Sequence, residues 1–225
     1  MTIYTTTKTD NMTFEETFRN MDRQDLTPTA PKKKFSISTI EIAGYVSALM
    51  ALRLPFGLGC RSVGSVAEKH SISEQGGHIE VSSVMDIEPK DLHLLSTLVK
   101  RGDEHAKVLR SIMVYAQIDA PIWFYRELET YRIGRERLSC ESTMHIECKG
   151  LGGAELEKAK DEIPMGHIQR TIDVYSYQAL RRIYFQRRNH RLPMWREFCS
   201  WIETLPFAEE LILTGLKDGA ENKGV

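Results

Sequence analysis

The sequence predicts a mixed α/β fold, of the α+β kind, whose C-terminal half is mainly helical. Apolar and polar residues alternate in two segments, as in half-buried strands, and apolar residues recur at helical spacing after Pro89 and Pro193. The chain has 225 residues, which is enough to bury a core. This length favours one domain with terminal extensions over two domains.

The chain divides into an arm, a domain and a tail. Residues 1–34 are rich in Thr, Asp, Asn and Lys and contain few clustered apolar residues, so we expect a mobile N-terminal arm. Its terminal lysine run is typical of a solvated charge cluster. We expect a single domain over residues 35–216, followed by a polar, frayed tail over residues 217–225.

The first part of the domain is expected to begin with a strand over residues 35–42 and a helix over residues 44–53, which ends before Pro55. Residues 57–77 contain five glycines without clear periodicity, so an irregular, mobile loop that lies over a ligand is expected there. A second strand is expected over residues 78–85.

The rest of the domain contains most of the predicted helices. One begins at Pro89 and runs through Val99, with Gly102 as its stop, and residues 105–115 fit either a helix or a strand. A further helix is expected with Pro121 in its first turn, where proline is best tolerated. The helical segments of the C-terminal half are expected at residues 122–132, 154–163, 168–188 and 193–203.

Composition excludes several classes of function. The formal net charge is −1, so no overall field draws the chain to nucleic acid or to an anionic membrane. The four cysteines show no CxxC pair and the N-terminus lacks the apolar run of a secretory signal, which indicates a reduced, cytoplasmic protein. No apolar run approaches the ~18 residues that span a bilayer, and no zinc-ligand spacing occurs, so neither membrane insertion nor a metal site is expected.

Arginine is concentrated in two regions of the C-terminal half. Guanidinium groups in neighbouring segments can cradle a phosphate or carboxylate, although solvated helix faces explain the same composition. Hydroxyl groups and an imidazole follow the first region, and Ser142 among them can donate to a phosphate oxygen. The arginines are Arg126, Arg132, Arg135, Arg137, Arg170, Arg181, Arg182, Arg187, Arg188, Arg191 and Arg196.

The order of these residues resembles the flavin-dependent thymidylate synthase family. That family carries an API segment before the signature RHRxxSxNExSxRY, and later a helix with an LR pair. Here seven residues separate Ala120-Pro121-Ile122 from Thr130. Ile163-Pro164 resembles the LP step, and the Arg of the LR pair falls on Arg187. A QWEI-like segment follows at residues 194–198. The resemblance covers residues 117–205.

The signature itself is altered in this chain. Thr130 and Tyr131 replace the first Arg and the His of RHR, the NE pair becomes Ser139-Cys140, and Met144 replaces the Arg of SxRY. The loop is also about two residues longer than usual. Much positive charge is therefore missing, and two further arginines inside the loop are candidates to restore it.

The resemblance implies a mixed sheet with flanking helices and a homotetramer that binds FAD and a pyrimidine nucleotide between subunits. In that family the reduced flavin supplies reducing equivalents, and methylenetetrahydrofolate supplies the carbon that is transferred to C5 of dUMP. NADPH is the reductant expected with them.

The resemblance also implies roles for individual residues. Carried over by position, Arg132 contacts a phosphate of flavin or nucleotide, Ser142 the nucleotide phosphate, and Arg187 the pyrimidine or its phosphate. A histidine upstream of API is expected to help bind flavin, with His105 and Arg110 as equal candidates. The predicted cofactor-binding residues are Arg132, Arg135, Arg137 and His105, and the predicted substrate-binding residues are Glu127, Ser142, Arg187 and Arg188.

Three classes of function follow. The first is a flavin-dependent enzyme that transfers a methyl or hydroxymethyl group to a pyrimidine nucleotide, which explains the order of the motifs. The second is a repurposed, non-catalytic relative that binds nucleotide or forms an oligomer, which explains the lost signature residues. The third, an arginine-rich nucleic-acid-binding protein, is disfavoured by the near-zero net charge.

Overall fold

The computed structural model describes residues 32–57, 69–75, 78–84 and 87–215. The expected tail at residues 217–225, and the expected arm up to residue 31, lie outside these ranges. Within the ranges, no helix reaches the length and apolarity that a membrane crossing requires.

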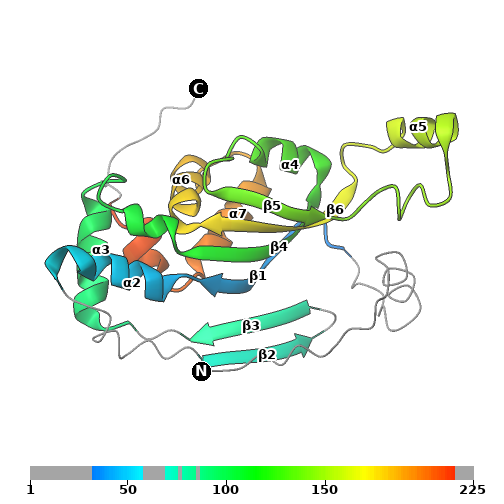
Figure 1. Ribbon diagram of the computed structural model, residues 1–225. Helices are drawn as coiled ribbons and strands as arrows, with labels where there is room; N and C mark the ends of the chain where they lie inside the picture. Colours follow the sequence, from blue (N-terminus) through cyan, green and yellow to red (C-terminus); the bar gives the residue numbers. More distant parts are fainter. Residues whose placement is uncertain (1–31, 58–68, 76–77, 85–86, 216–225) are drawn as a thin grey trace, which may run out of the picture.

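A four-stranded antiparallel sheet forms the centre of the molecule, in the order β1-β4-β6-β5 (Figure 1). The resemblance implied a mixed sheet, but every pairing between these strands is antiparallel. The central strands β4 and β6 pair along nine residues each, so they fix the register of the whole sheet. The strands are β1 (Ser36–Ala43), β4 (Met113–Pro121), β5 (Arg135–Cys140) and β6 (Ile168–Ser176).

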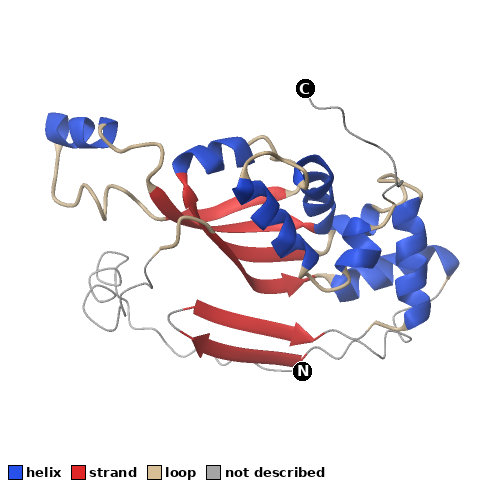
Figure 2. Ribbon diagram, turned by 180° about the vertical axis from the view of Figure 1, so that it is seen from behind, coloured by secondary structure: helices blue, strands red, loops and turns tan. Residues whose placement is uncertain are grey.

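Three helices cover one face of this sheet: α4 (Ile122–Leu128), α6 (Tyr177–Arg187) and α7 (Pro193–Glu203), as Figure 2 shows from behind. Alternate residues of β4 point toward them and are fully buried. Trp195 and Phe198 of α7 are also fully buried and pack with Phe124 of α4. This aromatic layer is the centre of the core.

Further helices gather at one end of the sheet, where a buried ion pair joins Arg53, the last residue of one helix, to Asp91 in the first turn of another. A separate hairpin lies beyond β1, and α5 sits on an arm that projects from the other end (Figure 1). These elements are α2 (Tyr45–Arg53), η1 (Leu54–Phe56), α3 (Pro89–Lys100), η3 (Lys107–Arg110), the π-helix η4 (Glu209–Leu213), β2 (Lys69–Gln75), β3 (His78–Val84) and α5 (Gly153–Asp161).

The predicted α/β fold is confirmed, and most predicted elements are present within a residue or two. The strands at 35–42 and 78–85 correspond to β1 and β3, and the helix at 193–203 corresponds to α7. The sequence of residues 105–115 fits either a helix or a strand, and the segment contains both the 3₁₀ helix η3 and the start of β4.

The single helix predicted over residues 168–188 is wrong in its first half, which is the strand β6. The residues of β6 that face the helices include Thr171, Asp173 and Tyr175, so the usual alternation of apolar and polar residues is lost. Strand β5 was missed for the same reason, because Arg135 and Arg137 project from it toward the covered face.

Two other boundaries also differ from the prediction. Residues 69–75 of the expected irregular loop form β2, which pairs with β3 along its whole length, while residues 58–68 lie outside the described residues. Helix α4 ends at Leu128 rather than at residue 132, and Pro121 is the last residue of β4 and the N-cap of α4 instead of lying in its first turn.

Candidate functional site

A pocket of about 500 Å³ opens where α6 begins, close to the start of β4 and the segment after α4. Its volume lies within the range of small-ligand sites. Two of its residues are arginines and one is an aspartate, so its formal charge is +1. The lining residues are Asp103, Arg110, Met113, Ile133, Gly134, Ser176, Gln178 and Arg182.

The polar side of this pocket suits an anion. Arg110 donates from Nε to Oε1 of Gln178 at 2.8 Å, which orients both side chains. Arg182 lies one turn further along α6. The N-terminus of α6 carries the positive end of its helix dipole, which also favours negative charge.

Two residues that line the pocket, Gly134 and Ser176, approach each other closely. Gly134 has φ +79°, and a Cβ added there would lie 2.5 Å from the Ser176 hydroxyl oxygen. Ser176 donates its backbone N–H to the Gly134 carbonyl at 2.7 Å, and its hydroxyl oxygen accepts from Ala179 N–H as the N-cap of α6. Glycine is therefore required at position 134 for both the backbone conformation and the space.

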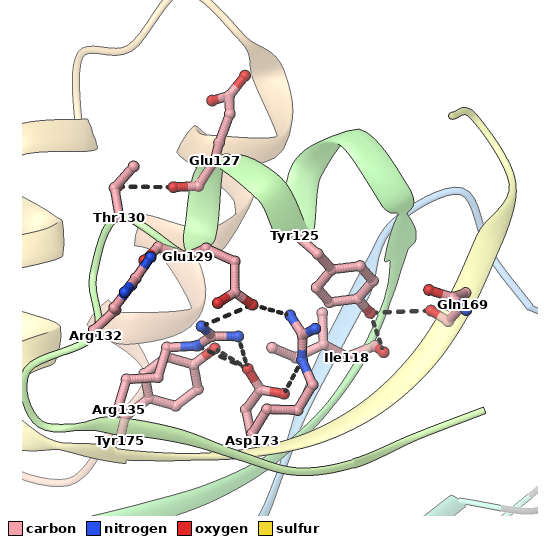
Figure 3. A network of polar contacts seen from close by, with 11 residues as sticks. Ile118, Tyr125, Glu127, Glu129, Thr130, Arg132, Arg135, Gln169, Asp173 and Tyr175 are labelled. Carbon is pink, nitrogen blue, oxygen red and sulfur yellow. Dashed lines mark hydrogen bonds and ion pairs between the residues drawn. The ribbon is translucent and has the colours of Figure 1, made fainter. Parts of the chain in front are cut away.

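Beside the pocket, β5 and β6 carry a buried ionic network between the sheet and α4 (Figure 3). Arg135 donates to Oδ2 of Asp173 from Nε at 2.8 Å and also from Nη2. Arg137 lies 2.9 Å from Oε1 of Glu129 and 3.7 Å from Oδ1 of Asp173. Asp173 is fully buried, so its charge depends on these arginines for compensation.

Aromatic rings hold the two guanidinium groups of this network. Arg135 lies over the ring of Tyr175 and Arg137 over the ring of Tyr125, at 5.8 and 4.8 Å from the centroids. Burial alone would lower the pKa of Arg135, but Tyr175 and Asp173 outweigh it and raise that pKa. Burial raises the pKa of Tyr175 well above its usual value. Arg135 is therefore charged and Tyr175 neutral at physiological pH.

A second cluster forms around Arg187 near the end of α6. Its guanidinium lies 4.6 Å from the Trp195 ring centroid and 5.5 Å from that of Tyr131, and its Nε donates to the Tyr131 hydroxyl at 2.6 Å. Trp195 in turn donates from Nε1 to Oε2 of Glu127 at 2.7 Å. Burial and then Arg187 lower the pKa of nearby His190, which favours its neutral form.

A further pocket, of about 380 Å³, is mostly apolar and lies where α7 begins, beside the start of β1. It is lined by Lys34, Phe35, Trp123, Leu192, Pro193, Met194 and Glu197. Among the described residues, no group of three or more His, Cys, Asp or Glu side chains is placed to hold a metal ion.

No protein-family model and no curated protein matches the sequence. Solved structures match along most of the chain. Flavin-dependent thymidylate synthase ThyX from Helicobacter pylori, complexed with FAD and dUMP, matches at 13% identity with a TM-score of 0.56, covering 81% of this chain and 100% of that chain. A second structure of that enzyme with FAD and dUMP has a TM-score of 0.58 at 12% identity, covering 81% and 99%.

This chain has the fold of a flavin-dependent thymidylate synthase. A UMP/dUMP methylase, PolB from Streptomyces cacaoi bound with 5-Br dUMP, is also similar, at 12% identity and a TM-score of 0.50, covering 80% of this chain and 92% of that chain. The resemblance seen in the sequence is therefore confirmed at the level of the fold. The identities are low, so the roles of individual residues stay predictions.

On this thymidylate synthase fold, the predicted site residues fall into groups. The cofactor candidates Arg132, Arg135 and Arg137 all lie around Glu129, with Arg132 donating from Nε to its backbone carbonyl at 3.4 Å (Figure 3). The substrate candidates Glu127 and Arg187 meet at Trp195.

Other predicted residues lie apart from these groups. Ser142 is half-buried at the base of the projecting arm, where its carbonyl accepts from His145 and Ile146. His105 is exposed, and Arg188 is the half-buried C-cap of α6. None of the three is among the residues that line the pocket at α6. Arg110, the alternative to His105, does line it.

Sequence reasoning missed Glu129, Asp173 and Gln178, and it did not single out Arg182 from the other arginines. Asp173 and Gln178 lay in a segment read as one continuous helix, which hid the strand-to-helix junction at Ser176. A serine followed by a helical pattern is an N-cap signal, and it was available at this position.

Proposed function

We propose that this chain binds a pyrimidine nucleotide and FAD and transfers a one-carbon unit to C5 of dUMP or a related pyrimidine nucleotide. The observation that carries the proposal is the pocket with Arg110 and Arg182 at the N-terminus of α6, in a fold shared with enzymes bound to FAD and dUMP. Methylenetetrahydrofolate as the carbon donor and NADPH as the reductant belong to the same proposal.

The residues of the pocket fit the phosphate end of a flavin nucleotide or a pyrimidine nucleotide. Arg110, Arg182 and the Gln178 amide offer donors to phosphate oxygens, and Met113 and Ile133 offer apolar contact for a flat ring. A bound flavin would supply the reducing equivalents of the reaction. The chain's own residues bind and orient the two ligands.

Arg187 is the second group that supports a nucleotide site. Its guanidinium is fixed by the rings of Tyr131 and Trp195, so little side-chain freedom is lost when it binds a carbonyl or phosphate oxygen. We propose that Arg187, with Arg188 and Glu127 beside it, orients the pyrimidine, and that Ser142 binds the nucleotide phosphate.

Absorbance and isotope release test this proposal. The purified protein incubated with FAD should stay yellow through gel filtration, and it should release tritium from C5-labelled dUMP when methylenetetrahydrofolate and a reductant are supplied. Arg182→Ala should weaken FAD or dUMP binding at least tenfold. Arg126→Ala removes an exposed arginine outside the pocket and should leave binding unchanged.

A second candidate is a nucleotide-binding protein of the same fold without catalysis. It is favoured by the internal engagement of three predicted ligand-binding residues: Arg135 with Asp173, Arg137 with Glu129, and Glu127 with Trp195. A colourless protein that binds dUMP but neither retains FAD nor releases tritium would select this candidate over the first.

The proposal includes a homotetramer in the cytoplasm. Exposed apolar side chains on β5 and on the projecting arm support contacts between copies of the chain. The described cysteines Cys140, Cys148 and Cys199 are free thiols, which is typical of a reducing compartment.

A further inference from the structure

The three arginines predicted to bind cofactor all contact one residue, Glu129, and two of them, Arg135 and Arg137, do so at its side-chain carboxylate (Figure 3). Its Oε1 lies 2.9 Å from Nη2 of Arg137 and 3.7 Å from Nη1 of Arg135. Arg132 reaches the backbone carbonyl of the same residue. One acidic side chain therefore lies where the guanidinium groups of Arg135 and Arg137 converge.

The two carboxylates of this network, Asp173 and Glu129, differ in how easily another anion can displace them from the arginines. Asp173 is fully buried in the middle of β6 and bonded to Arg135, so it is a permanent part of the core. The Glu129 side chain is 48% exposed and follows the last turn of α4. Exposed ion pairs contribute little to stability, so a competing anion can replace this one.

The guanidinium groups are held in place without Glu129. Tyr175 lies under Arg135 and Tyr125 under Arg137. Arg137 is half-buried, and its buried atoms Nε and Nη2 lack a well-aligned hydrogen bond among the described residues, although carboxylates lie within ion-pair distance. A phosphate group presents more acceptor oxygens than one carboxylate and can satisfy these donors.

The formal charge of the network depends on whether Glu129 is in place. With Glu129 in place, Arg135 and Arg137 are balanced by two carboxylates. When Glu129 turns outward, the network has a charge of +1, and exposed Arg132 adds a further positive charge at its rim. Counted with Arg132, the three arginines and two carboxylates carry a formal charge of +1 when Glu129 is in place and +2 when it has turned outward.

We propose that Glu129 covers a phosphate-binding site formed by Arg132, Arg135 and Arg137, and that a phosphate or diphosphate ester displaces its carboxylate on binding. Glu129 thereby sets the affinity and selectivity of the site, because a ligand must bind the arginines more strongly than the Glu129 carboxylate does. The inference deepens the proposed function, because these arginines are its candidate cofactor ligands.

Titration with inorganic pyrophosphate tests this inference without FAD or dUMP. All variants carry Arg182→Ala, so that the contribution of the pocket at α6 is reduced and is the same in every variant. Glu129→Gln should bind pyrophosphate at least tenfold more tightly than the parent by isothermal calorimetry. Glu136→Gln removes the same charge from an exposed residue of β5 and should change the affinity less than twofold.

A double variant tests whether the gain in pyrophosphate affinity depends on Arg137. Adding Arg137→Gln to Glu129→Gln should abolish the gain, and Glu129→Ala should reproduce the gain if the glutamine variant folds poorly. Equal affinities for the Glu129 and Glu136 variants, or a gain that survives loss of Arg137, would overturn the inference. Because no step uses flavin, the result stands whether or not tritium release supports the proposed reaction.

Discussion

Asp173 is the residue on which the ionic network depends. Its carboxylate is inaccessible to solvent, accepts from Arg135 and from the Tyr175 hydroxyl, and lies within ion-pair distance of Arg137. A buried charge is tolerated only when its neighbours compensate it. Asp173 lies on β6 and both arginines lie on β5, so the charges of each strand require the other strand.

Removing this carboxylate should strongly destabilise the protein. Asp173→Ala removes the only carboxylate that is hydrogen-bonded to Arg135 among the described residues and leaves the half-exposed Glu129 at 3.7 Å, and we expect the free energy of unfolding to fall by about 3–5 kcal/mol in urea denaturation. Glu136→Ala on the same pair of strands removes an exposed carboxylate and should change it by less than about 0.5 kcal/mol. Similar losses for both variants would mean that the buried pairing contributes little.

At the scale of elements, the junction between β5, β6 and α6 positions the pocket. The turn at Gly134 brings β5 against Ser176, which ends β6 and caps α6. The pocket and the ionic network therefore share one structural support. A change at this turn should affect both stability and ligand binding.

Gly134→Ala tests the junction, with Gly150→Ala as a matched control. Both glycines have positive φ, so each alanine carries about 1–2 kcal/mol of backbone strain. At Gly134 the new Cβ also strikes the Ser176 hydroxyl and weakens a cap that contributes about 1 kcal/mol, whereas at Gly150 none of the described residues lies within 4 Å. Thermal melting should show a clearly larger loss for Gly134→Ala; equal losses would contradict the close approach.

Whether an element was predictable depended on where its polar residues point. Helix α7 has apolar residues on one side and begins with a proline, and its bounds match the prediction at both ends. Strand β6 places Asp173 and Thr171 on the covered face, so no periodic pattern marks it as a strand. The residues that form the candidate site are thus the ones that obscured its secondary structure.

At the scale of the whole molecule, the projecting arm over residues 141–167 exposes apolar side chains to solvent in a single copy of the chain. In Figures 1 and 2 the arm extends away from the sheet and its helices. Ile146 and Met165 on the arm, and Leu138 on β5, are large apolar residues with exposed side chains. Contacts with another copy of the chain would remove them from water.

The proposed homotetramer predicts a mass of about 103 kDa in solution, four times the 25.8 kDa of one chain. Light scattering after gel filtration measures this mass directly. Ile146→Ser should shift it toward smaller species, because an apolar contact is lost, whereas Lys149→Ser on the same arm should not. A mass of one chain at every concentration would contradict the assembly.

The sequence by itself determined the α/β class, the bounds of α2, α3, α5 and α7 to within about two residues, and the resemblance to the thymidylate synthase fold. These follow from local periodicity, capping residues and the order of short motifs, which act over a few residues. Only the tertiary structure decided how the arginines are used. Pairing of β5 with β6 brings Arg135 and Arg137 to Asp173, and the end of α4 brings Glu129 over them. Charges distant in sequence compensate one another only after the strands pair, so composition alone could not separate ligand-binding arginines from internally paired ones.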